Sequence, residues 1–247
     1  MQTEGYTIPH DDKKEINGED GHFIYEKNGK TYVCVFDGVG SWVKQGVNVK
    51  EFVNEMIDNC IEAIEYGHKT PELILDYALN ETSSTGSATV IFAVIEGQSM
   101  KVCQIGDAGM LILNKNKIVF ETDEQQHSFN YPYQIGKENE KFFGESPNQG
   151  IFYRIALNDG DQIILGSDGL FDNLKNEEIV EISKKYPLQT INPNNSFSKM
   201  LCEQAYRNSK QQLRIVPFFE RAYEEGAISY LKSGGKEDDI TCIVVIV

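Results

Sequence analysis

The most informative part of this chain is the stretch Gln162-Ile-Ile-Leu-Gly-Ser-Asp168-Gly-Leu-Phe-Asp172-Asn173. It predicts a buried strand over 163–165, a tight turn and then the start of a helix. A carboxylate at the end of an apolar strand is costly unless it is paired or bound to a cation. Asp168 and Asp172 are four residues apart, so they share a face if the helix continues, and they repel unless a cation lies between them.

Other acids stand in similar places along the chain. An apolar run also ends at Asp37-Gly38, another ends at Gly106-Asp107, and the pair Asp238-Asp239 precedes the predicted final strand, 240–247. A single Asp-Gly at a strand end is most often only a turn. Taken alone, Asp107 caps a turn, and the pairs Glu19-Asp20 and Asp238-Asp239 are solvated. The question is therefore whether these acids converge in the fold.

Composition narrows the classes of protein and of partner. The chain has 247 residues, which suits one large domain or two small ones. Its 23 basic and 38 acidic residues give a formal net charge of −15. That excess disfavours nucleic acid or an anionic membrane as the main partner. No run approaches the ~18 apolar residues of a membrane helix, so we expect no membrane insertion.

Five cysteines without CxxC spacing argue against a disulfide framework or a zinc site, and favour a reducing, intracellular compartment. The N-terminus has no apolar signal region and is too acidic for a transit peptide. We therefore expect a cytoplasmic protein, or a mitochondrial one if a presequence has been removed.

The order of predicted elements indicates a layered α+β domain with largely antiparallel sheets, because strands come first, helices follow in blocks and a strand returns at the end. We expect strands at 23–25, 31–36, 88–95, 101–105, 110–113, 118–121, 151–156, 162–165 and 240–247. Of these, 101–121 are predicted as a meander and 151–165 as a hairpin. We expect helices at 50–66, 70–79, 176–186, 196–209 and 217–231, and loops at 1–21, 122–150 and 187–195.

The acids suggest a divalent cation. Mg²⁺ and Mn²⁺ take carboxylate, carbonyl and water oxygens, and two such ions can clamp a phosphate and activate a water. Asp37, Asp168 and Asp238 could supply ligands, and Gly38 would let the backbone approach an ion closely because it lacks Cβ. The four histidines are scattered, and neither a GxxxxGK[ST] loop nor a GxSxG elbow is present.

Five motifs in order resemble those of the metal-dependent serine/threonine protein phosphatases of type 2C. They are Asp37-Gly-Val-Gly40, Gly86-Ser-Ala-Thr89, Ile105-Gly-Asp-Ala-Gly109, Ser167-Asp-Gly-Leu-Phe-Asp-Asn173 and Asp238-Asp-Ile-Thr241. Each motif is weak alone, but the ordered set is specific and spans 18–247. The Gly18-Glu-Asp20 and Gly234-Gly-Lys-Glu-Asp-Asp239 segments resemble the branch that includes the T-cell-activation and mitochondrial phosphatases.

The resemblance implies one catalytic domain over 1–247, with 1–17 loosely ordered. It implies a four-layer α-β-β-α sandwich, two antiparallel sheets flanked by helices, with a dimetal site for Mn²⁺ or Mg²⁺ at one end. In that family Asp37, Asp168 and Asp238 correspond to catalytic metal ligands, the Gly38 carbonyl binds one ion, and Glu19 and Asp20 lie at or near the site. Asp107 and Asp172, with Asp168, correspond to a weaker third ion. The implied activity is hydrolysis of phosphoserine and phosphothreonine in proteins by a metal-activated water, by a monomer.

The chain departs from the family at two positions. Many members have a histidine where this chain has Val39, so proton donation falls to water or another residue, with His22 and His127 as candidates. Many have an arginine that grips phosphate where this chain has Lys13 and Lys14, and both lysines fit a solvated surface better. The phosphate-binding residue is therefore not assigned.

Two rival interpretations stay open. One is a catalytically weak pseudophosphatase that acts as a binding module, against which the complete set of metal-motif acids argues. The other is an acidic binding domain whose carboxylates only face solvent. The segments 122–150 and 187–217 are predicted to shape access for the substrate.

Overall fold

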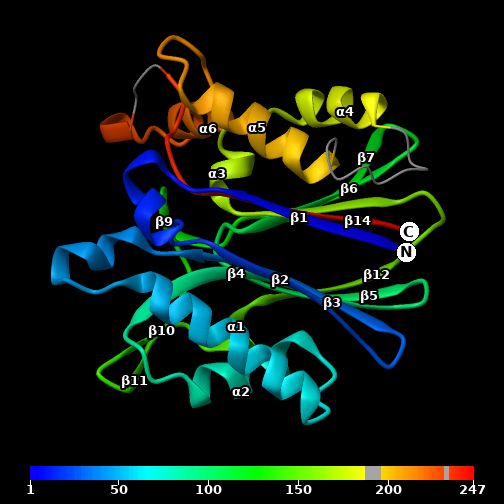
Figure 1. Ribbon diagram of the computed structural model, residues 1–247. Helices are drawn as coiled ribbons and strands as arrows, with labels where there is room; N and C mark the ends of the chain where they lie inside the picture. The colour runs from blue at the N-terminus through cyan, green and yellow to red at the C-terminus, as the bar shows by residue number, and fades with distance from the viewer. Residues whose placement is uncertain (187–195, 231–233) are drawn as a thin grey trace.

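Two stacked antiparallel sheets form the centre of the structure, a computed structural model that describes residues 1–186, 196–230 and 234–247 (Figure 1). The first sheet has the order β1-β14-β13-β6-β7. Its strands are β1 (Gln2–Ile8), β6 (Gly109–Asn114), β7 (Lys117–Glu121), β13 (Gln162–Gly166) and β14 (Ile240–Ile246).

The second sheet is built around the long strand β4, which pairs with β3 on one side and with both β5 and β10 on the other. Its strands are β2 (Gly21–Lys27), β3 (Lys30–Gly38), β4 (Gly86–Glu96), β5 (Ser99–Ile105), β10 (Ile135–Glu138), β11 (Lys141–Gly144) and β12 (Ile151–Ala156). Two short strands, β8 (Gln126–Ser128) and β9 (Tyr131–Pro132), pair only with each other.

Helices cover both outer faces. Over the second sheet lie α1 (Val49–Glu65) and α2 (Pro71–Glu81); α3 (Asp168–Phe171), α4 (Asn176–Lys185), α5 (Phe197–Ser209) and α6 (Pro217–Glu224) lie on the side of the first sheet. The described residues also include the 3₁₀ helices η1 (Asp11–Ile16), η2 (Gly40–Gln45), η3 (Pro147–Gln149) and η4 (Ile228–Tyr230). The predicted α+β, four-layer α-β-β-α sandwich is confirmed.

The strand sequences explain this layering. In β3, Val33 and Val35 pack between the two sheets, whereas Cys34 and Phe36 point toward α1 and α2. Neighbouring side chains of a strand point to opposite faces, so a strand covered on both faces must be apolar almost throughout. This is why the strands beside the site could be identified from their apolar runs.

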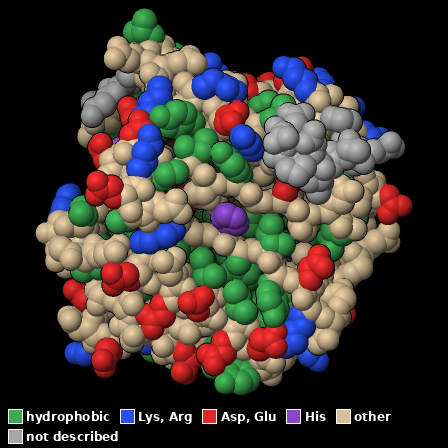
Figure 2. Space-filling model, in the orientation of Figure 1, with side chains coloured by type: hydrophobic (Ala, Val, Ile, Leu, Met, Phe, Trp, Pro, Cys, Tyr) green, Lys and Arg blue, Asp and Glu red, His purple; other side chains and the backbone are tan. Residues whose placement is uncertain are grey.

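The acidic excess lies partly on the outer surface. Figure 2 shows Asp and Glu side chains gathered over the layer of α1 and α2. Helix α1 carries exposed Glu51, Asp58 and Glu62. Among the described residues, no helix is both long and apolar enough to cross a bilayer. The five cysteines are free and buried.

The prediction of a loop over 1–21, with 1–17 loosely ordered, is wrong. Residues Gln2–Ile8 form β1, which pairs in antiparallel register with the whole of β14, from Gln2 opposite Ile246 to Ile8 opposite Ile240. Residues Asp11–Ile16 then form η1. The segment has no clear apolar alternation, and its order comes from a partner strand more than 200 residues away in the chain, which local sequence cannot indicate.

Two predicted strand pairings are also wrong. Strand β5 pairs with β4 and β12 in the second sheet, whereas β6 pairs with β13 in the first, so 101–121 are not a meander. Strands β12 and β13 likewise belong to different sheets and form no hairpin. Turn residues predict that a chain reverses, but they do not say whether the next strand joins the same sheet or the one stacked on it.

The segment 122–150 is not a plain loop, since it contains β8, β9, β10, β11 and η3. These strands are two to four residues long, too short for apolar periodicity to reveal them. Helix α6 ends at Glu224 rather than near 231, because Gly226 adopts a left-handed φ of 67° and terminates it. The predicted loop at 187–195 lies outside the described residues.

Candidate functional site

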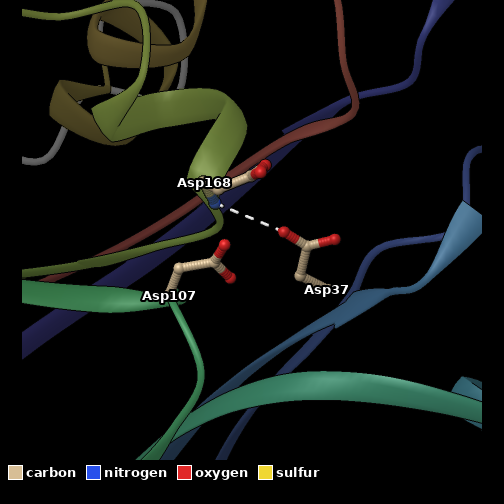
Figure 3. A group of neighbouring side chains, drawn as sticks. All are labelled: Asp37, Asp107 and Asp168. Carbon is tan, nitrogen blue, oxygen red and sulfur yellow. Dashed lines mark hydrogen bonds between the residues drawn. The ribbon is translucent and has the colours of Figure 1, made fainter. Parts of the chain in front are cut away.

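Three aspartates meet where strands of both sheets end (Figure 3). Asp37 lies near the end of β3, Asp107 lies where the chain crosses from β5 to β6, and Asp168 begins α3 directly after β13. One carboxylate oxygen from each lies within 4.8 Å of the others. The backbone N–H of Asp168 also donates to Oδ2 of Asp37 at 3.3 Å.

This arrangement depends on close approaches of the backbone. Helix α3 packs so tightly on the start of β14 that a Cβ on Gly169 would lie 2.0 Å from the Asp239 carbonyl oxygen. Gly106, with a φ of +91°, turns the chain between the two sheets and leaves no room for a Cβ beside the Tyr133 carbonyl. These glycines allow Asp107 and Asp168 to reach one place.

The three carboxylates form an electrostatically unfavourable group. Burial raises the pKa of Asp37 well above its ordinary value, and Asp168 adds to the rise. Burial and then Asp168 also raise the pKa of Asp107 well above normal. Like charges held together in a low-dielectric place favour protonation or a bound cation. The three side chains are partly exposed, but they converge, which separate solvent-facing carboxylates would not require.

Lys236 supplies one cation to this group. Its ammonium contacts Asp168, lies 2.5 Å from Oδ2 of Asp172 and lies 3.5 Å from Oδ2 of Asp238. Burial opposes the charge, yet these carboxylates raise the pKa of Lys236 well above its ordinary value. The side-chain amide of Asn173 makes two hydrogen bonds with the Lys236 backbone. Its Nδ2 donates to the Lys236 carbonyl, and its Oδ1 accepts from the Lys236 N–H.

A second acidic group lies beside the first. Asp20 is 1% exposed, and burial raises its pKa to about 8, with Asp239 as the next cause. Neither Asp20 carboxylate oxygen has a well-formed hydrogen bond within the described part of the chain. The Lys13 ammonium lies 2.5 Å from Oε2 of Glu19 and 3.0 Å from Oδ2 of Asp239. Lys13 is thus an internal counter-ion, and its assignment to the solvated surface is wrong.

Asp172 belongs to a salt-bridge network on the other side. It follows α3, its side chain is 4% exposed, and it contacts both Lys236 and Arg221 of α6. Arg221 also pairs with Glu124 at 3.2 Å. Asp172 therefore lies beside Asp168, as its spacing predicted.

Gly38 and Asp238 are two further predicted site residues that do not belong to the group of three aspartates. Gly38 pairs with Ala88, and its missing Cβ makes room for the Glu19 carbonyl oxygen, which would lie 2.7 Å away. Asp238 accepts a hydrogen bond from the N–H of Asp239 and lies outside the group of three. Its charge still contributes to the raised pKa of Asp37.

The candidate proton donors have other partners. His22 lies 3.2 Å from the Thr7 hydroxyl, and His127 pairs with Glu145 at 2.9 Å and stacks on Tyr133. Lys14 is exposed and pairs with Asp11. Sequence reasoning missed the roles of Lys236 and Arg221, because their partners come from other elements. The only signal was the position of Lys236 two residues before Asp238.

Comparisons with known proteins agree with this geometry. A family model described as protein phosphatase 2C matches residues 10–214. "Probable protein phosphatase 2C 80" of Arabidopsis thaliana is 33% identical over 241 residues, which are 96% of this chain and 56% of that protein. "Probable protein phosphatase 2C 55" of the same plant is 34% identical over 240 residues, 96% of this chain and 50% of that protein. The chain spans about half the length of these relatives.

A solved structure is similar over the whole chain. The photosystem II phosphatase PBCP has a TM-score of 0.91 and 32% identity, over 100% of this chain and 98% of that one. The catalytic domain of the serine/threonine phosphatase PstP, solved with two manganese ions, shares the fold with a TM-score of 0.61 and 14% identity, over 98% and 96% of the two chains. The converging aspartates, the layered fold and the match over 10–214 agree: this chain belongs to the protein phosphatase 2C family.

Proposed function

We propose that this protein is a Mn²⁺- or Mg²⁺-dependent protein serine/threonine phosphatase. The observation that carries the proposal is the convergence of Asp37, Asp107 and Asp168 from three parts of the chain. Three carboxylates within 4.8 Å are a costly arrangement that a divalent cation would stabilise. The names of the relatives and their membership in one family support the same activity.

The donor atoms fit a hard divalent ion. All three are carboxylate oxygens, and no His or Cys joins them in the part of the chain that the structure describes. The buried oxygens of Asp20, which lack well-formed hydrogen bonds, extend the same donor set.

We assign two ions to Asp37, Gly38, Asp168, Asp238 and Asp20, with Glu19 at the edge. A weaker third ion is assigned to Asp107, Asp168 and Asp172. Such ions would supply Lewis acidity toward phosphoryl oxygens and a water of lowered pKa.

The chain's own residues organise this place. The N–H of Asp168 fixes the Asp37 carboxylate, and the Trp42 indole N–H donates to the Ser87 hydroxyl at 2.7 Å, which secures the turn after Asp37. Lys13 holds Glu19 and Asp239 together from the side of η1. The carboxylates are therefore held in place before any substrate arrives, which lowers the cost of ordering them during the reaction.

The test is hydrolysis of a phosphothreonine peptide with added Mn²⁺, with Mg²⁺ and with EDTA. Asp168→Asn is expected to reduce turnover by at least about a thousandfold and to keep the circular dichroism spectrum. Asp58→Asn, an exposed position on α1, serves as the matched control and should behave like the unchanged protein. Full turnover in Asp168→Asn, or equal turnover in EDTA, would refute the proposal.

One observation favours the second candidate, a pseudophosphatase that acts as a binding module. The ammonium of Lys236 already neutralises Asp168 and Asp172, so it competes for the carboxylates that an ion needs. Calorimetric titration with Mn²⁺ separates the two candidates. Absence of binding at millimolar Mn²⁺ would favour the pseudophosphatase.

A further inference from the structure

A pocket of about 400 Å³ opens beside Asp107, on the side of the acidic group that faces α4 and α6. Its walls come from the start of β6, the residues after β7, the end of α3 and the first turns of α4 and α6. Because Asp107 borders both this pocket and the three-aspartate group, a peptide with its phosphate at that group could place a neighbouring side chain here.

Polar and apolar residues both line the pocket. Met110, Phe171, Leu174 and Pro217 line it, and Met110 and Leu174 are buried. Phe171 and Pro217 are partly exposed, and they suit the methylene stem of a long side chain, because stems of this kind pack on apolar surface while a polar end stays near water.

The rim is acidic, and its basic residues already have partners. Lys175 pairs with Glu220, and Arg221 pairs with Asp172 and Glu124. Two further carboxylates on the rim, Glu121 and Glu177, have no cationic partner in the described structure.

These two rim acids are placed to receive a charge. The Asn176 amide donates to Oε2 of Glu121 at 2.9 Å and fixes its direction, and Glu177 is the next residue on α4. Two carboxylates beside the partly exposed Phe171 and Pro217 are complementary to a cationic head on an aliphatic stem.

We infer that this pocket binds an arginine or lysine side chain of the substrate, close in sequence to the phosphorylated residue. The inference rests on the proposed phosphatase function, since it gives that function a substrate class: phosphoproteins with a basic residue beside the phosphosite. The net charge of −15 favours encounter with such basic segments.

The experiment compares phosphothreonine peptides that differ only in one arginine, replaced by citrulline, which has the same stem and no charge. The arginine is moved through each position within about four residues of the phosphothreonine, a reach of roughly 13 Å in an extended peptide. We expect kcat/KM to be about fivefold to tenfold higher for arginine at one or two positions. The size corresponds to about 1–1.4 kcal/mol of partly screened ion pairing, and the ratio should fall as salt is raised.

Substitution of the two rim acids tests whether the preference for arginine comes from this pocket. Glu121→Gln and Glu177→Gln should each reduce the arginine-to-citrulline ratio, and the double variant should bring it close to one. Glu181→Gln is the matched control, because Glu181 lies one turn further along α4, is 61% exposed and pairs with Lys184. An arginine ratio of one at every position in the unchanged protein would overturn the inference. An undiminished ratio in the double variant, or a preference for acidic peptides, would do the same.

A separate assay distinguishes failure of the proposed phosphatase function from failure of this inference. Hydrolysis of p-nitrophenyl phosphate by the unchanged protein with Mn²⁺ reports the chemistry without using the pocket. If that hydrolysis is absent, the phosphatase assignment fails, and fluorescence anisotropy of the labelled arginine and citrulline peptides still tests the pocket. Equal binding of the two peptides would then overturn the inference by itself.

Discussion

Lys236 shows how a single side chain can stabilise an acidic site and also compete for it. Its ammonium contacts Asp168 and Asp172 and also lies over the ring of Phe218, with Nζ 4.9 Å from the ring centroid. Without a cation, the carboxylates at this end of the sandwich would repel one another. An ion that binds Asp168 must therefore displace a counter-ion that belongs to the chain itself, and the displacement reduces the apparent affinity for the ion.

Replacement of Lys236 by methionine tests this competition. Lys236→Met keeps an unbranched side chain and removes the charge, so we expect calorimetry to show about tenfold tighter Mn²⁺ binding, equivalent to about 1.4 kcal/mol. The control is Lys210→Met, because Lys210 also pairs with two acids, Asp11 and Glu237, neither of which is an assigned ligand. Unchanged or weaker Mn²⁺ binding in Lys236→Met would show that the ammonium orients the ligands rather than competing with the ion.

For single residues of the site, the sequence indicated the acids but not their counter-ions. Asp37 and Asp168 were recognisable because each follows an apolar strand, where a carboxylate is costly unless it is paired or bound to a cation. Arg221 has ordinary sequence surroundings, and Lys236 is marked only by its place two residues before Asp238. Their roles come from contacts with residues 168, 172 and 124, far away in the chain. A lysine or arginine with partners this distant cannot be told from a solvated one by local pattern.

Among the elements, the junction of β13, α3 and β14 determines where Asp168 lies. Helix α3 is only four residues long, so its position depends on packing rather than on its own stability. Leu170 packs in the core beside Ile240 and Cys242 of β14, and the Asp172 N–H bonds to the Asp168 carbonyl at 2.7 Å. The direction of the Asp168 side chain therefore depends on how closely α3 can approach β14.

Gly169→Ala is predicted to separate these elements. The new Cβ would lie 2.0 Å from the Asp239 carbonyl oxygen, so backbone must move, and we expect a loss of about 3 kcal/mol in the free energy of unfolding. Gly109→Ala is a suitable control, since its Cβ would meet its nearest atom, the Thr122 hydroxyl, at 3.3 Å. Urea denaturation measures both variants, and equal stability of the two would contradict the close approach as the cause.

The elements themselves were predictable to different degrees. Strands β3, β4 and β14 are long and rich in β-branched residues, and helix α1 has an apolar face, so their extents were found within a few residues. The sheet to which each strand belongs was not found, as β5 and β6 show. The Gly106 turn between them could have closed a hairpin equally well, and only the packing of two sheets decides that it crosses instead.

For the molecule as a whole, the raised pKa values at the site predict that stability depends on pH. The buried Asp20 has its pKa raised to about 8, and burial raises those of Asp37 and Asp107 well above normal as well. In the unfolded chain these groups ionise near pH 4. Between the two pKa values the native state therefore binds more protons than the unfolded state. The stability that these groups contribute is fully present below about pH 4 and is lost as pH rises toward 8.

The metal-free protein, kept in EDTA, should therefore melt at a lower temperature as pH is raised from 5 to 8. A loss of roughly 2–3 kcal/mol corresponds to a fall of about 5–10 °C for a chain of this size. Thermal melts followed by circular dichroism measure this fall. Asp20→Asn, which resembles the protonated side chain, should flatten the curve and raise the melting temperature at pH 8.

Saturating Mn²⁺ should also oppose the fall, since ion binding requires ionised carboxylates and is strongest where they are deprotonated. The pairs that Lys236 and Lys13 make with the remaining acids should persist across this range, because both ammonium groups have raised pKa values. These pairs therefore contribute equally to stability from pH 5 to 8 and do not cause the fall in melting temperature. A melting temperature that rises from pH 5 to 8 in EDTA would show that these counter-ions already neutralise the whole acidic group, and that its carboxylates are ionised in the absence of metal.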